Sequence, residues 1–180
     1  MEFYKFENTS KDARVLLSIN RLAISSSKYI GFADFRMNII EVMKCFRKAY
    51  KVIDKLTRVG LRYQNIIKFV REEGTVPIER YLNLNLKLPD AIPGKYMFFE
   101  TAFVSKTEGG TITTKLQPMM AKDGSHEALL LDFDHAMEGG ELRIGNYDLY
   151  LKESHEYTKK MFEQLITEEY KRYLRGEVVK

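Results

Sequence analysis

The sequence predicts an α+β fold, a mainly antiparallel sheet with two long helices packed on it. Two apolar stripes at helical spacing predict the helices, one over residues 34–55 and one between Asn146 and Gly176. Alternating apolar and polar side chains predict the strands, and Glu108-Gly109-Gly110 predicts a hairpin turn between two of them. Hairpins outnumber plausible parallel crossovers, which excludes a doubly wound α/β fold.

The first half of the chain supplies strands, a helix and another strand. Residues 13–24 alternate in a way that predicts one or two strands. Asp34 is the expected N-cap of the first helix, which should end near Lys55. Cys45 lies among the apolar residues of that helix and is expected to be buried. Residues 57–70 predict one long strand with a strongly polar face.

The second half predicts a meander closed by a helix. Pro77 is suited to open a short helical segment, and Pro89 and Pro93 favour an extended connection. Three strands are expected over residues 96–105, 111–117 and 127–134, and Gly139-Gly140 predicts a turn after the last of them. Asn146 is the expected cap of the closing helix, which has an apolar face on which His155 should be packed and hydrogen bonded.

Length and composition indicate one folded domain over residues 1–180. The chain is 44% hydrophobic and 30% charged, which is typical of a globular protein and not of a disordered one. Its apolar runs are far shorter than the roughly 20 residues that cross a bilayer, and the N-terminus has no signal-peptide pattern. We therefore expect no membrane partner and a cytoplasmic location. The net charge of +4 selects no particular partner.

Known catalytic and cofactor motifs do not occur in the sequence. The three histidines are dispersed and there is one cysteine, so the spacing of a zinc site is missing. Neither a phosphate-binding glycine loop nor a nucleophile elbow occurs. The sequence thus predicts no bound metal and no cofactor, and leaves catalytic residues unknown.

Two strand segments carry the candidate site residues. Arg58, Arg62 and Gln64 share one face of their strand, because their positions differ by even numbers, and Asp132 and Asp134 share one face of another. If the faces meet, they form either a structural ion-pair network or a polar pocket for an anionic ligand. The Asp-x-Asp pair also has the form of a divalent-metal clip, although two carboxylates supply too few oxygens.

The string Arg58-Val59-Gly60-Leu61-Arg62-Tyr63-Gln64-Asn65, followed by Tyr81-Leu82-Asn83, resembles the signature of a sporadically distributed prokaryotic family of uncharacterised proteins. Residues 131–134 and the segment from His155 to Glu168 resemble that family's penultimate strand and closing helix. The resemblance extends from about Phe3 to Gly176 and implies no particular activity. Members of the family have a further N-terminal strand and helix, which this chain is expected to lack. A sheet edge left open in this way favours a homo-oligomer, such as a dimer.

Three functions follow as hypotheses. The leading one is a non-catalytic module that associates with itself and binds a protein partner or a small anionic ligand near the arginines and aspartates. The first alternative is nucleic-acid binding through a basic row on the helix 34–55, opposite its apolar stripe, because such a row contacts phosphates. This row consists of Lys44, Arg47, Lys48, Lys51 and Lys55. The second alternative is a hydrolase that uses Asp132 and Asp134 with a divalent metal.

Overall fold

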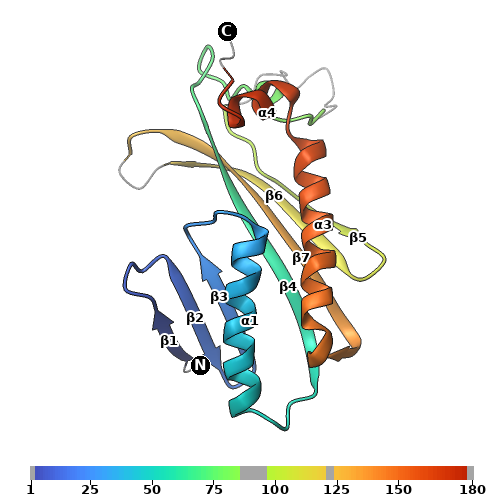
Figure 1. The fold of residues 1–180 in the computed structure, drawn as a ribbon. Helices are drawn as coiled ribbons and strands as arrows, with labels where there is room; N and C mark the ends of the chain where they lie inside the picture. The colour runs from blue at the N-terminus through green and yellow to red at the C-terminus, as the bar shows by residue number, and fades with distance from the viewer. Residues whose placement is uncertain (1–2, 86–96, 121–123, 178–180) are drawn as a thin grey trace. The chain divides into compact units, whose positions relative to one another are not determined.

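The chain has the expected α+β fold, shown in Figure 1. This computed structural model describes residues 3–85, 97–120 and 124–177. The chain forms two compact units, the first made of Met1–Lys55 and Arg143–Asp148, the second of Leu56–Leu142 and Leu149–Lys180. Its strands form two sheets, one of three strands and one of four. A single domain over residues 1–180 stays a prediction.

The first unit contains a three-stranded antiparallel sheet in the order β1-β2-β3. Its strands are β1 (Phe3–Glu7), β2 (Ala13–Ser18) and β3 (Arg21–Ser26). The expectation of one or two strands over residues 13–24 is therefore confirmed, with two strands present, whereas β1 has no counterpart among the predicted strands. The turn after β1 is held by Asn8, whose side-chain oxygen accepts hydrogen bonds from the backbone N–H groups of Asp12 and Ala13 at 3.1 and 3.0 Å.

Helix α1 (Phe32–Ala49) differs from its prediction at both ends. Gly31 occupies the N-cap position, and Asp34 lies in the first turn, where a negative charge interacts favourably with the helix dipole. The helix ends at Ala49 instead of near Lys55, because the backbone turns at Tyr50 and the next strand begins at Lys55. Cys45 is exposed, so its predicted burial is wrong.

The second unit is built on a four-stranded sheet in the order β4-β7-β6-β5. Its strands are β4 (Lys55–Phe69), β5 (Thr101–Lys106), β6 (Thr111–Met120) and β7 (Glu127–Arg143). The long strand and the antiparallel meander of β5, β6 and β7 are confirmed.

Strand β7 is longer than its prediction. It continues past Asp134 to Arg143, so Gly139 and Gly140 lie within the strand and not in a turn after it. Their φ values of 74° and 63° belong to the left-handed region, which glycine adopts without strain. Pro89 and Pro93 lie outside the described residues, and so does the start of the strand expected over residues 96–105.

Three helices belong mainly to this unit: α2 (Ile78–Tyr81), α3 (Tyr147–Leu165) and α4 (Glu168–Leu174). Pro77 is the N-cap of α2, which confirms the short helical segment expected there. A 3-10 turn, η1 (Ile144–Asn146), precedes α3, so Asn146 is the last residue of that turn and lies directly before the helix. The predicted closing helix is broken at Ile166, which forms a β-bridge with Leu82. Thr167 then caps α4 by accepting a hydrogen bond from the Tyr170 backbone N–H at 3.1 Å.

The core of the second unit lies between the sheet and α3. Leu129, Leu131 and Phe133 of β7 are fully buried, and the Phe133 ring packs edge-on against Phe162 of α3, with 6.5 Å between centroids. Other buried members of this core are Ile67, Phe69, Val76, Ile78, Leu82, Ile112, Leu116, Ile166 and Tyr170. Since Phe133 contacts α3, the odd-numbered side chains of β7 face the helix and the even-numbered ones face away.

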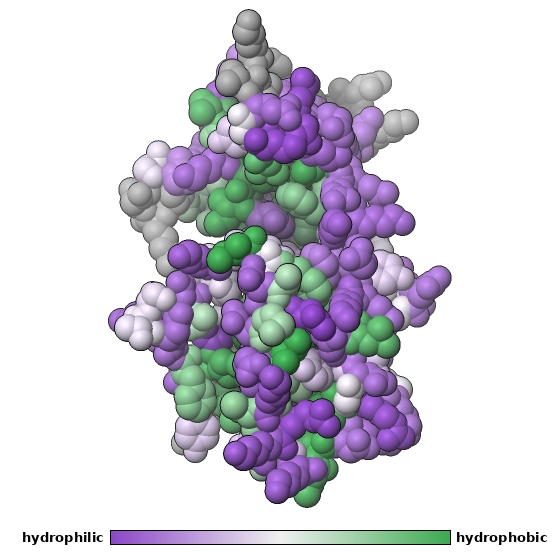
Figure 2. All heavy atoms as spheres, in the orientation of Figure 1, coloured by the Kyte–Doolittle hydropathy of each residue, from purple (hydrophilic) through white to green (hydrophobic). Residues whose placement is uncertain are grey.

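On the face drawn in Figure 2, hydrophilic side chains predominate and hydrophobic ones form smaller groups between them. Exposed hydrophobic side chains occur on both edge strands considered below, including Phe6 of β1 and Val104 of β5. None of the helices in the described residues is long and apolar enough to cross a bilayer.

Candidate functional site

The predicted polar faces meet on the side of the four-stranded sheet that points away from α3. Side chains directly opposite each other in an antiparallel pair share a face. On this face Asp134 lies opposite Thr113 of β6, and Asp132 lies opposite Lys115. The arginines of β4 reach across to the same carboxylates, so the structure brings together all five residues singled out in the sequence.

Asp132 is the centre of this cluster. Arg62 Nε donates to Asp132 Oδ1 at 2.8 Å, and Arg62 Nη2 donates to Asp132 Oδ2. Gln64 Nε2 lies 3.4 Å from the same Oδ2. The Asp132 side chain is 6% exposed and that of Arg62 is 55% exposed, so the arginine covers the carboxylate. Hydrogen bonding to Asp132 raises the pKa of Arg62.

Arg58 bridges two further carboxylates. Its Nη2 lies 3.1 and 3.2 Å from the two Asp134 carboxylate oxygens, and its Nε donates to Glu138 Oε1 at 2.7 Å. The sequence pattern does not identify Glu138, because the predicted strand ends at Asp134. Glu138 lies four residues after Asp134, an even spacing that places both side chains on the same face of β7. This spacing would identify Glu138 if the strand were known to continue past Asp134.

Charges within the cluster balance. Arg58, Arg62 and Lys115 supply three positive charges, and Asp132, Asp134 and Glu138 supply three negative ones. Each of the three carboxylates accepts a hydrogen bond from an arginine. The arrangement is therefore a preformed ion-pair network, whose carboxylates are already occupied by donors.

Two other polar residues of the signature connect β4 to its neighbours. Tyr63 Oη lies 3.1 Å from His155 Nδ1 on α3, and Asn65 Nδ2 donates to the Leu131 carbonyl at 3.3 Å. His155 is thus packed and hydrogen bonded, as its place in the sequence predicts. Both contacts stabilise the packing of the second unit.

Asn83, the last residue of the signature, binds the end of α3. Its Nδ2 donates to the carbonyls of Gln164 and Ile166 at 3.1 and 3.0 Å. The carbonyl groups at a helix end have no partner within the helix. The asparagine therefore satisfies backbone groups where the last helical segment is broken.

His135 forms a second polar cluster, on the helix-facing side of the sheet. The ring is fully buried, with Nδ1 2.9 Å from Ser154 Oγ and Nε2 3.0 Å from Thr107 Oγ1. Tyr157 stacks on it at 4.9 Å between centroids. Burial lowers the pKa of His135 below its ordinary value, although Asp134 opposes this shift.

We predict that acid destabilises the protein partly through His135. Because its folded pKa is lowered, the unfolded state binds more protons below the ordinary histidine pKa of about 6.5, and the free energy of unfolding falls as pH falls through that value. Burial also lowers the pKa of His155, so this residue adds to the same dependence of the unfolding free energy on pH. Urea unfolding between about pH 7.5 and 5 should show this loss, and His135→Gln should flatten it. A variant as steep as the wild type would contradict the prediction.

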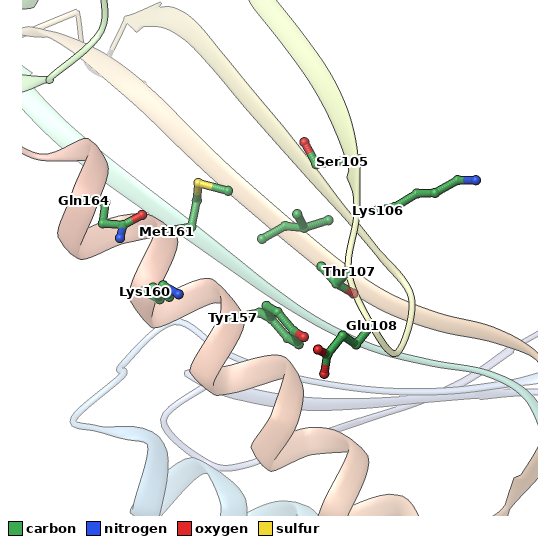
Figure 3. A pocket seen from close by; sticks show the side chains of 9 residues that line it. Ser105, Lys106, Thr107, Glu108, Tyr157, Lys160, Met161 and Gln164 are labelled. Atoms are coloured by element: carbon green, nitrogen blue, oxygen red, sulfur yellow. The ribbon is translucent and has the colours of Figure 1, made fainter.

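A pocket of about 400 Å³ lies between α3 and the β5–β6 hairpin. Tyr157, Lys160, Met161 and Gln164 come from α3, and the hairpin contributes residues 105–108 (Figure 3). The Lys106 side chain points away from the helix in this view. Thr107, which lines the pocket, is hydrogen bonded to the buried His135.

The basic row of the nucleic-acid hypothesis does not lie on one helix. Since α1 ends at Ala49, only Lys44, Arg47 and Lys48 belong to it, while Lys51 lies in the following turn and Lys55 opens β4. Lys44 also forms an ion pair with Glu41 at 2.6 Å. The prediction of a continuous helical row of five cations is therefore wrong.

Within residues 3–85, 97–120 and 124–177, no three side chains of His, Cys, Asp or Glu are grouped so that they could hold a metal ion. Comparisons with known protein families, curated proteins and solved structures find no match for this chain. The family resemblance of the signature stays a prediction.

Proposed function

We propose that the chain is a non-catalytic binding module that associates with itself. The observation that carries this proposal is the edge strand β5, which pairs with β6 on one side and lies at the end of the sheet order. Edge strands offer unpaired backbone groups to another chain. Self-association through such an edge needs no additional domain or cofactor.

The side chains of β5 favour pairing with a strand of another chain. Phe103 is 38% exposed and Val104 is 67% exposed, at the centre of the strand. Proteins commonly protect an edge with proline or with charges, and β4, at the opposite end of the sheet, carries four lysine and arginine side chains. Only Lys106, at the end of β5, is charged in that strand.

The ion-pair network supports a binding role over a catalytic one. A general base or a metal-binding carboxylate needs a free oxygen, whereas Asp132 and Asp134 accept hydrogen bonds from arginines. The balanced charge of this cluster also suits a protein surface of mixed charge better than a small anion, which would have to compete with those carboxylates. Binding of a small anionic ligand there stays a prediction, as does a location in the cytoplasm.

Sedimentation velocity of the intact chain tests the proposal. We expect a concentration-dependent species of twice the 21.1 kDa chain mass. The edge contact is mainly backbone and apolar, so the dimer should persist at about 0.5 M NaCl. A chain that sediments as a monomer up to millimolar concentration would refute the proposed self-association.

A further inference from the structure

The hairpin that joins β5 to β6 determines which backbone groups of β5 face outward. The Thr107 N–H donates to the Gly110 carbonyl at 2.9 Å, so these two residues form a hydrogen-bonded pair. Such pairs alternate with non-hydrogen-bonded pairs along an antiparallel ladder. In the β5–β6 register, Phe103 and Ser105 therefore bond to β6, while Ala102, Val104 and Lys106 direct their backbone groups to the outer edge.

This alternation restricts how a second β5 can pair with the first. In an antiparallel pair about a two-fold axis, outward-facing residues must lie opposite outward-facing residues. Registers that place an even-numbered residue opposite an odd-numbered one are thereby excluded. Each remaining register has its two-fold axis centred on a single residue of β5.

Charge selects one of these registers. Centring the two-fold axis on Phe103 places Ala102 opposite Val104, and it places Glu100, the residue directly before β5, opposite Lys106 of the other copy. Centring it on Val104 places Glu100 opposite Glu108, where like charges repel. Glu100 and Lys106 are both exposed, and neither forms an ion pair with any other residue that the structure describes.

The edge of the other sheet offers a useful contrast. Strand β1 also has exposed aromatic side chains, Tyr4 and Phe6. Its charges are already used within the chain, because Glu7 forms ion pairs with Lys5 at 2.9 Å and with Arg14 at 2.7 Å. Glu100 and Lys106, by contrast, form no ion pair within the described residues and can pair with a second copy. This difference favours β5 over β1 as the strand through which the chain pairs with itself.

We infer that two copies of this chain pair antiparallel through β5, with Phe103 facing Phe103 across a two-fold axis and Glu100 facing Lys106 on either side. This inference rests on the proposed self-association. It joins the two four-stranded sheets into one continuous eight-stranded sheet. Both α3 helices then lie on the same face, because the two-fold axis is perpendicular to the sheet.

Cysteine cross-linking tests the register. The background is Cys45→Ser, since the only cysteine is exposed. A non-hydrogen-bonded pair has its Cα atoms about 4.5 Å apart, within disulfide range, so Phe103→Cys should cross-link under mild oxidation. Thr101→Cys and Ser105→Cys are matched controls, because neither faces its own copy. Efficient cross-linking of a control, with none at position 103, would overturn the inference.

Reversing the charge at the exposed positions 100 and 106 gives an independent test of the register. Glu100→Lys and Lys106→Glu should each weaken dimerisation about tenfold, because each places two like-charged pairs in the interface. The double variant restores both pairs and should regain wild-type dimerisation. A wild-type dimer with no effect of either single variant and no cross-link at position 103 would overturn this register and leave self-association standing. A monomeric wild type would overturn both.

Discussion

Gly110→Ala should destabilise the protein by about 3 kcal/mol, one of the two largest losses expected for a single substitution. A Cβ atom at this position would overlap the Ala136 carbonyl oxygen and lie 2.9 Å from the carbonyl carbon. These are backbone atoms of β7, so the clash is not relieved by rotating a side chain. Urea unfolding at about pH 7.5, above the histidine titration, measures the loss.

Gly109→Ala is the matched control in the same turn. Its Cβ would meet the Met137 Cε at 3.2 Å, and this flexible side-chain end can move. Its cost should stay below about 1 kcal/mol. Equal stability of the two variants would show that the close approach of the hairpin to β7 does not constrain position 110.

Phe133→Ala should cost about 3–5 kcal/mol, because truncating a buried aromatic ring leaves a cavity. Phe133 is 0% exposed and packs edge-on against Phe162, so the substitution removes contacts on both the sheet and α3. The free energy of unfolding from urea titration reports this loss. It is a large part of the roughly 5–15 kcal/mol that typically stabilises a domain.

Phe6→Ala provides the comparison for an exposed ring. Phe6 is 57% exposed on β1, and its truncation should change stability by less than about 1 kcal/mol. If Phe133→Ala lost no more than Phe6→Ala, the assignment of Phe133 to the core would be wrong.

Much of the second unit is predictable because its signals are local. The alternation of residues 57–70 predicts β4, and the turn at Glu108-Gly109-Gly110 predicts the β5–β6 hairpin. Even spacing places Arg58 with Arg62, and Asp132 with Asp134, on single strand faces, which the structure brings together. Strand periodicity needs no information from distant residues.

The errors arise where distant segments decide the structure. The last helix is broken because Leu82 and Asn83 bind its backbone near Ile166, and no local pattern indicates that contact. Glu138 joins the network through Arg58 of β4, a partner 80 residues away in the sequence. Strand β1 is not predicted because it has only five residues, two of them charged, which is too short a segment to show a clear alternation of apolar and polar side chains.

Hydrogen exchange of the β5 amides tests self-pairing through this edge most directly. Single-residue exchange rates, measured below and above the dimer dissociation constant, should slow with concentration at Ala102, Val104 and Lys106, whose N–H groups face outward. The amides of Phe103 and Ser105, which bond to β6, should change little. Equal rates at both concentrations for the three outward amides, in a chain that dimerises, would contradict pairing through β5.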